Sequence, residues 1–210
     1  LLPATEEAHE KQTLEEVQRN AMKINSLIHQ VLNFNRIEDN EDSLLILSRI
    51  ELVSFSHSLF SVYEEDKRLT FLFETNKAKI YADMDAIKLG VILDSLLSNA
   101  VKFTPDGGSI RLSLFYREET GLVDICVSDT GSGIPPRDIP YIFQRFFQSP
   151  HSGNKEGTGI GLYLVKTYTE LHGGHITGVT SEEGKGTSVG LNIPVIAVEE
   201  EEIPATQEKK

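Results

Sequence analysis

Residues Ser95–Thr104 read S-L-L-S-N-A-V-K-F-T, and they close a long apolar segment that opens near Asp85. Leucine, isoleucine and valine recur in this segment at helical spacing on more than one face, which is typical of a helix packed against a sheet. Asp85 is a suitable N-cap, and the run P-D-G-G at 105–108 predicts a stop followed by a turn.

Four polar or aromatic residues share one face of this predicted helix. Ser95 lies four residues before Asn99, and Lys102 and Phe103 lie three and four residues after it. A hydroxyl, an amide, a cation and an aromatic ring on one stripe are unexpected in a helix that is otherwise apolar. Taken alone, the stripe fits a ligand-binding face and a solvated face equally well.

Composition limits the possible partners of the chain. Its 210 residues suit one ordinary domain plus an appendage, and 39% hydrophobic and 25% charged residues are ordinary for a soluble globular protein. The net charge of −12 argues against nucleic acid and against an anionic membrane surface as partners.

Cys126 is the single cysteine, which excludes an internal disulfide and suits a reducing compartment. No apolar run is long enough to span a bilayer, so we expect a cytoplasmic protein without direct membrane insertion. Because the chain starts at Leu1 rather than Met, we expect a fragment of a longer protein.

The segment from about Thr13 to Ile37 has the pattern of a long amphipathic helix. Its apolar residues step by three and four in a heptad pattern: Leu14, Val17, Ala21, Ile24, Ile28 and Val31. Such a stripe packs either on its own domain or on another chain. Its position at the terminus, ahead of the acidic break at 38–42, favours a homodimer through Leu14–Val31.

The rest of the chain alternates between short strands and helices. We predict strands at 44–47, 69–74, 79–82, 109–116, 122–128, 175–181 and 187–193, and further helices at 51–65, 135–147 and 160–172. The fold class is therefore α+β, a two-layer α/β sandwich with helices on one face of a mixed sheet, preceded by the long helix. We expect a helical segment at 1–40, one domain at 44–196 and an acidic tail or linker at 197–210.

Two glycine-rich segments are candidates for ligand binding. D-T-G-S-G-I at 129–134 follows a predicted strand, so it sets a carboxylate beside backbone that a flat ligand can approach closely, although a common turn has the same pattern. G-T-G-I-G-L at 157–162 enters a predicted helix, whose amides and dipole suit phosphates, although a flexible loop is the alternative. In F-Q-R-F-F at 143–147, Arg145 is either an anion contact or an exposed surface residue.

Together these segments resemble the catalytic, ATP-binding domain of sensor histidine kinases, a branch of the ATPases that includes gyrase, mismatch-repair proteins and an ATP-driven chaperone. S-L-L-S-N-A-V-K-F-T resembles the N box, D-T-G-S-G-I the first glycine box, F-Q-R-F-F the F box and G-T-G-I-G-L the second glycine box, in the family's order. G-K-G-T at 184–187 is similar to the last box, and residues 14–38 resemble the second helix of the dimerisation and phosphoacceptor hairpin. The sequence of these motifs is closest to that of hybrid bacterial sensors.

The resemblance implies a site for ATP and Mg²⁺. Asp129 would accept a hydrogen bond from the adenine amino group, with Gly131 and Gly133 leaving room for the base, Phe103 lying against it and Thr187 lining its pocket.

At the phosphate end, Asn99 would hold Mg²⁺, Lys102 would neutralise phosphate charge and Arg145 would reach the γ-phosphate, and these three carry the catalytic roles. The nucleotide-binding set implied by the resemblance is Ser95, Asn99, Lys102, Phe103, Asp129, Gly131, Gly133, Ile134, Gly157, Thr158, Gly159, Gly161, Leu162 and Thr187.

The resemblance implies an ATP-dependent protein-histidine kinase core of a two-component system, with a fused or separate response-regulator receiver domain as partner. The chain departs from the family at Ser95, where the N box usually begins with asparagine. H-E-K-Q-T-L at 9–14 imitates the phosphoacceptor box without its proline, and we interpret this as coincidence, so the accepting histidine is expected outside this chain. The alternative is a non-catalytic nucleotide-binding regulatory module. In either case the chain would be cytoplasmic, or the cytoplasmic portion of a membrane-anchored sensor.

Overall fold

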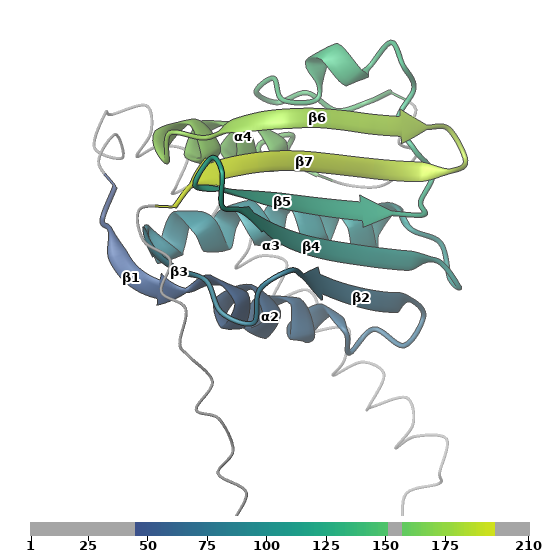
Figure 1. The fold of residues 1–210 in the computed structure, drawn as a ribbon. Coiled ribbons are helices and arrows are strands. Elements are labelled where there is room, and N and C mark those ends of the chain that lie inside the picture. The colour runs from purple at the N-terminus through teal and green to yellow at the C-terminus, as the bar shows by residue number, and fades with distance from the viewer. Residues whose placement is uncertain (1–44, 151–156, 196–210) are drawn as a thin grey trace, which may run out of the picture. The chain divides into compact units, whose positions relative to one another are not determined.

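The computed structural model describes residues 45–150 and 157–195 of the chain (Figure 1). The chain divides into two units, Leu1–Ser43 and Leu44–Lys210, and every described residue belongs to the second. The helix predicted at 13–37 and the tail predicted at 197–210 therefore lie outside the described residues. Within the described ranges, no helix combines the length and the apolarity needed to cross a membrane.

A mixed sheet with the strand order β2-β4-β5-β7-β6 forms one layer of the domain. Its strands are β2 (Thr70–Thr75), β4 (Ser109–Arg117), β5 (Leu122–Asp129), β6 (His175–Glu182) and β7 (Gly186–Pro194). β2 pairs parallel to β4, and the other neighbours pair antiparallel. The end of β5, the start of β7 and the end of β6 therefore lie side by side at one end of the sheet.

Helices α2 (Leu52–Tyr63), α3 (Ala86–Phe103) and α4 (Gly161–Leu171) cover one face of this sheet (Figure 1). α3 contacts both of the other helices. The core between the layers is made of fully buried side chains that include Leu89, Ile92, Leu93, Leu97, Ile110, Leu112, Leu114, Ile125, Leu164 and Leu191. The predicted α+β fold with helices on one face of a mixed sheet is confirmed.

The predicted helix after Asp85 is confirmed, and its ends are set by local chemistry. The Asp85 carboxylate accepts hydrogen bonds from the backbone N–H groups of Ile87 and Lys88, at 3.1 and 3.0 Å. At the other end, Thr104 leaves the helical conformation, and both its N–H and its hydroxyl donate to the carbonyl of Ala100. Pro105 follows and has no N–H with which to continue the helix. These caps place the polar stripe of α3 at its C-terminal end.

Strands β1 (Ser48–Glu51) and β3 (Tyr81–Met84) form a separate antiparallel ribbon. The strand predicted at 44–47 is wrong, because β1 begins only at Ser48, whereas the strand predicted at 79–82 agrees with β3 within two residues at each end. Residues 45–47 are not in a strand, and the N–H of Ile46 donates to the Asp85 carboxylate at 3.0 Å instead of to a neighbouring strand.

The helix predicted at 135–147 is also wrong. The segment contains a single 3₁₀ turn, η2 (Ile139–Tyr141), and otherwise a chain of turns. Pro140 lacks the N–H that a longer helix would require, and its ring disfavours α-helical dihedral angles at the residue before it. Phe146 takes a positive φ of 62°, a left-handed conformation that no helix interior contains. The other predicted helices and strands agree with the structure within about two residues at each end.

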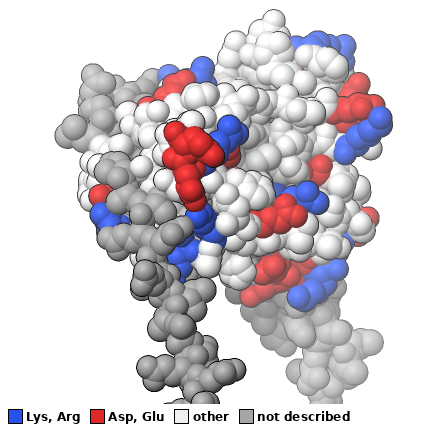
Figure 2. Space-filling view, in the orientation of Figure 1, with Lys and Arg blue, Asp and Glu red and all other residues white. Residues whose placement is uncertain are grey.

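Charged groups of opposite sign lie next to one another on the face shown in Figure 2, with uncharged surface between them. The ion pairs around β2, β4 and β5 include Arg117 with Asp124, Lys77 with Glu118, and Arg111 with Glu74. Such exposed pairs contribute little to stability, at most about 1 kcal/mol each.

Candidate functional site

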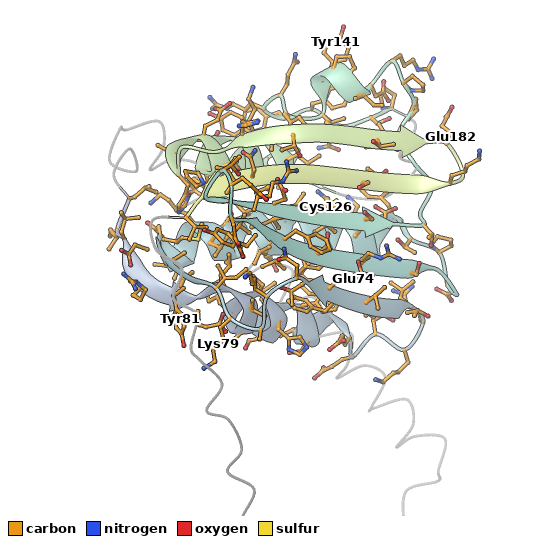
Figure 3. The ribbon with its side chains drawn as sticks, viewed as in Figure 1. Glu74, Lys79, Tyr81, Cys126, Tyr141 and Glu182 are labelled. Carbon is orange, nitrogen blue, oxygen red and sulfur yellow. The ribbon has the colours of Figure 1, made fainter. Side chains whose placement is uncertain are left out.

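A row of polar side chains crosses three strands at one end of the sheet. Asp129 on β5 pairs with Thr187 on β7, and Thr187 pairs with Ser181 on β6. Cross-strand partners point to the same face of a sheet. That face is the helix-covered one, because Ile125 and Val127 alternate with Asp129 along β5 and are buried. Figure 3 labels Glu182 beside this row, where β6 ends.

The Asp129 carboxylate is held through one of its oxygens. Oδ1 accepts hydrogen bonds from the backbone N–H groups of Gly131, at 2.8 Å, and of Thr187, at 3.2 Å. Within the described residues, Oδ2 has no hydrogen-bond partner. Burial raises the pKa of Asp129, and the two backbone hydrogen bonds offset this only in part. The side chain therefore presents a fixed acceptor, desolvated but with one oxygen available to a donor.

The first glycine segment is packed directly against the β6–β7 hairpin. A Cβ atom at Gly133 would lie 2.1 Å from the carbonyl oxygen of Glu182, and one at Gly186 would lie 1.9 Å from the carbonyl oxygen of Asp129. The N–H of Gly184 donates to the carbonyl of Ser132 at 2.8 Å. Both close approaches involve backbone, which does not move aside easily, and glycine is therefore required at both positions.

The same segment also touches the C-terminal end of α3. The N–H of Ser132 donates to the carbonyl of Phe103 at 3.1 Å, and a Cβ atom at Gly131 would lie 2.6 Å from that carbonyl oxygen. Sequence reasoning gave Gly131 and Gly133 the role of leaving room for a base. In the structure, the atoms that demand glycine at these positions belong to the protein itself.

The polar stripe of α3 faces the second glycine segment. The Lys102 ammonium lies 3.0 Å from the position of a Cβ atom at Gly157, and the Ser95 hydroxyl lies 3.7 Å from the corresponding position at Gly161. Gly161 is the first residue of α4. The Lys102 ammonium also lies 4.8 Å from the ring centroid of Phe103. The N-terminus of α4 and one side-chain cation thus converge on the same region, and both favour an anion there.

Asn99 lies on α3 between Ser95 and Lys102 and is half-buried. Its amide has no hydrogen-bond partner within the described residues, so the carbonyl oxygen is available as a ligand. Those residues contain no group of three or more His, Cys, Asp or Glu side chains that could hold a metal ion. A Mg²⁺ ion that takes one amide oxygen, phosphate oxygens and water does not need such a group.

The F-Q-R-F-F segment and the second glycine segment are joined by hydrogen bonds. The N–H of Phe146 donates to the carbonyl of Gly159 at 2.9 Å, and the Gln148 amide donates to the carbonyl of Gly157 at 2.8 Å. Gly159 has a φ of +70°, and a Cβ atom there would lie 2.6 Å from the backbone carbon of Phe146. Arg145 is exposed, and its guanidinium lies 4.9 Å from the ring centroid of Phe146.

Three predicted site residues remain, Thr158, Leu162 and Ile134, and Thr158 and Ile134 form hydrogen bonds that involve backbone N–H groups. The Thr158 hydroxyl accepts from the N–H of Ile160 at 3.3 Å, and Leu162 is half-buried in the first turn of α4. The N–H of Ile134 donates to the hydroxyl of Ser181 at 2.7 Å. Sequence reasoning did not single out Ser181. Its position opposite Thr187 could have been found by aligning the alternation of the last two strands across their turn.

A model of one protein family matches residues 84–197 of the chain, and its description is histidine kinase-, DNA gyrase B-, and HSP90-like ATPase. The chain is 31% identical to the sensor histidine kinase WalK of Bacillus subtilis, over 80% of this chain and 28% of that protein. It is 33% identical to the hybrid signal transduction histidine kinase D of Dictyostelium discoideum, over 88% of this chain and 12% of that protein. The chain therefore spans less than a third of the length of these relatives.

Solved structures show the same fold. Full-length ShkA in complex with AMPPNP superposes with a TM-score of 0.72 at 24% identity, over 91% of this chain and 40% of that chain. The nucleotide-free catalytic domain of the histidine kinase ThkA gives a TM-score of 0.62 at 25% identity, over 71% of this chain and 97% of that chain. With a family model that covers more than half of its residues, the chain belongs to the histidine kinase-, DNA gyrase B- and HSP90-like ATPases.

Proposed function

We propose that this chain is the ATP-dependent core of a protein-histidine kinase of a two-component system. It binds ATP between α3, the Asp129 end of the sheet and the second glycine segment. It transfers the γ-phosphoryl group to a histidine on a dimerisation hairpin. The relatives at 31% and 33% identity, both histidine kinases, support this assignment.

The base-binding end of the proposed site is the polar row at the end of the sheet. The Oδ2 atom of Asp129 accepts a hydrogen bond from the exocyclic amino group of adenine, while Oδ1 stays bonded to the backbone of Gly131 and Thr187. Phe103 lies at the neighbouring end of α3 and supplies an aromatic surface for the base. A carboxylate that receives a buried amine contributes about 1.5–3 kcal/mol to binding.

The phosphate-binding end is the meeting point of the α3 stripe with Gly157 and Gly161. Lys102 and the N-terminus of α4 neutralise the phosphate charge, and Arg145 approaches the γ-phosphate. Asn99 would hold Mg²⁺ through its amide oxygen, and the ion would supply neutralisation of the charge that develops on the transferred group.

The proposal rests mainly on the chemistry of the two ends of one site, which offer a hydrogen-bond acceptor for the base and a cation for the phosphates. The Oδ2 acceptor of Asp129 is available at the base end. The Lys102 ammonium lies against the glycine segment at the phosphate end. The C-terminal part of α3 contacts both ends of this site.

The hairpin, the second copy and the receiver domain complete the proposed function. The chain forms a homodimer through the heptad stripe at 14–31, and the phosphoryl group passes from the histidine to a receiver domain, fused or separate.

The test is transfer of label from γ-³²P-ATP to a complete dimerisation hairpin supplied with the chain. We expect an acid-labile, base-stable phosphate, as phosphohistidine gives, and we expect N99A, which removes the amide oxygen, to lose at least about 100-fold in rate. S98A is the matched control on α3, because the Ser98 hydroxyl bonds the carbonyl of Ser95 on its own helix and the Tyr63 side chain on α2. Nucleotide binding without any transfer by the wild type would instead support the non-catalytic module.

A further inference from the structure

The hydroxyl group of Ser181 connects the parts of the proposed base site. It accepts the N–H of Ile134, at 2.7 Å, and thereby anchors the first glycine segment to β6. It also donates to the carbonyl of Gly186, at 3.0 Å, where β7 begins. The Thr187 hydroxyl lies 2.9 Å away.

Counting protons fixes the direction of these hydrogen bonds. A serine hydroxyl has one proton and two lone pairs. The carbonyl of Gly186 can only accept, so the proton of Ser181 goes there. The bond between the hydroxyls of Ser181 and Thr187 must then use the proton of Thr187. Ser181 is thereby saturated, and the hydroxyl of Thr187 is left with lone pairs alone.

The polar row consequently presents acceptors. Thr187 and Asp129 are cross-strand partners on the same sheet face, and the Thr187 N–H is bonded to Oδ1 of Asp129. The Thr187 hydroxyl oxygen has no partner other than Ser181 within the described residues. An exocyclic group that meets two acceptors must supply donors. An amino group does so through its two N–H bonds, whereas a carbonyl oxygen at the same place would be repelled.

We propose that Ser181 is a positioning residue that fixes the hydrogen-bond polarity of the base site, so that the site selects a purine with an exocyclic amino group over one with a carbonyl. The proposal rests on the nucleotide-binding function proposed above. Ser181 acts through Thr187 and Ile134, and no contact with the nucleotide itself is required of it.

The test compares the affinities of the whole chain for ADP and for inosine diphosphate, in which a carbonyl replaces the amino group. S181A releases the Thr187 proton, and the hydroxyl can then turn and donate to the inosine carbonyl. We expect ADP to bind about tenfold more weakly to S181A, whereas inosine diphosphate binds as well as before or better. S181T keeps a hydroxyl at this position and restores the preference of the wild type.

Two further variants separate polarity from simple damage. S128A removes the hydroxyl of the residue next to Asp129. That hydroxyl bonds Ser188, at 2.9 Å, on the opposite face of the sheet. The variant should therefore leave both affinities unchanged. T187V keeps the backbone N–H that bonds Asp129 but removes the acceptor itself. It should weaken ADP binding without improving the binding of inosine diphosphate.

Equal weakening of both nucleotides in S181A, or no change in either, would overturn the proposal, because a merely structural role predicts the same loss for both ligands. A wild-type chain that binds neither nucleotide would contradict the proposed function instead, and the two failures are therefore distinguishable.

Discussion

At the residue scale, folding and binding place opposite demands on Asp129. Burial raises the pKa of its carboxyl group, so the ionised form that is present at neutral pH lowers the stability of the free protein. For a raised pKa, the stabilising contribution is present below the unfolded value of 3.8 and is lost as the pH rises through the folded value. The ligand, in contrast, needs the acceptor that this group provides.

D129N should therefore stabilise the free chain and abolish nucleotide binding. The asparagine oxygen can still accept from Gly131 and Thr187, since both bonds use Oδ1 alone, while an NH₂ group replaces Oδ2. We expect the thermal midpoint at pH 7 to rise by about 2 °C and the further rise on adding ADP to disappear. D124N, on the same strand but ion-paired with Arg117, should keep the ADP response. An unchanged ADP response in D129N would remove Asp129 from the base site.

We expect His172 to make the stability of the described domain depend on pH in the mildly acidic range. Its Nδ1–H donates to the carbonyl of Tyr168 at 2.7 Å, and Nε2 accepts the N–H of Asp85 at 3.2 Å, which requires the neutral ring. Burial lowers its pKa below 6.5, a shift that the Tyr168 carbonyl and Asp85 oppose and Lys88 reinforces. The stabilising contribution is therefore complete above pH 6.5 and is lost as the pH falls below it.

Urea unfolding at pH 7.5 and pH 5.5 measures this dependence. H172Q should be less stable than the wild type by about 1–3 kcal/mol at pH 7.5, because buried partners lose their hydrogen bonds. Its decrease in free energy of unfolding between the two pH values should be smaller than that of the wild type. H57Q, which replaces an exposed histidine, should keep the full decrease. The same decrease in H172Q and the wild type would show that His172 does not cause it.

The sequence predicts the position of a residue in the site when nearby residues set that position, and it fails when contacts with distant segments set it. The positions of Asn99 and Lys102 follow from helical spacing alone, and the structure sets Lys102 against Gly157 and Asn99 on the same stripe, between Ser95 and Lys102. The packing role of Gly133 could not be predicted, because the carbonyl that forbids a side chain there belongs to Glu182, which is distant in sequence. Ser181 was missed for the same reason.

At the scale of elements, α3 was predictable and the segment before Phe147 was not. The caps of α3 are supplied by residues at its own ends, Asp85 and Thr104, and its apolar residues repeat without interruption. The phenylalanines at 143, 146 and 147 imitate a helical period, but they are spaced along turns that end against Gly159. Pro140 removes one backbone hydrogen-bond donor that a helix would need, and apolar periodicity alone is therefore a poor predictor of a helix in this segment.

The contact between those turns and the second glycine segment should position the residues at the phosphate end of the site. In G159A, the new methyl group would meet the backbone of Phe146 and Phe147 at 2.6–2.8 Å, and the φ of +70° adds strain. We expect a loss of about 1–3 kcal/mol in stability and about tenfold or more in ATP affinity, with a smaller loss for AMP. The measurements are urea unfolding and calorimetric titration.

G121A is the matched control for this prediction. Gly121 also has a positive φ, +65°, but a Cβ atom there meets nothing within 4 Å, and the residue lies in the β4–β5 hairpin. Its substitution should reduce stability through backbone strain alone and leave both nucleotide affinities unchanged. If G159A and G121A weakened ATP equally, contact between the two segments would have no part in phosphate binding.

At the scale of the whole molecule, the two-layer architecture followed from the alternation of strand and helix patterns, but the strand order did not. β2 lies at an edge and pairs parallel to β4, although β3 and α3 separate the two in sequence. That pairing depends on how α2 and α3 pack on the sheet, which no local pattern encodes. Likewise, a hairpin could be predicted for β6 and β7, but not that β7 would pair with β5 and bring Thr187 to Asp129.

The assembly of the chain is a separate prediction, from sequence alone. The stripe Leu14–Val31 lies outside the described residues, and its heptad pattern predicts self-association through it. I24E places a charge in that stripe, whereas S26E adds the same charge at a heptad position outside it. We expect light scattering to give a dimer for the wild type and for S26E, and I24E to dissociate at least about tenfold more readily, because burying an unpaired carboxylate is strongly unfavourable. A wild type that stays monomeric at high concentration, or an I24E variant that associates as the wild type does, would contradict the proposed homodimer.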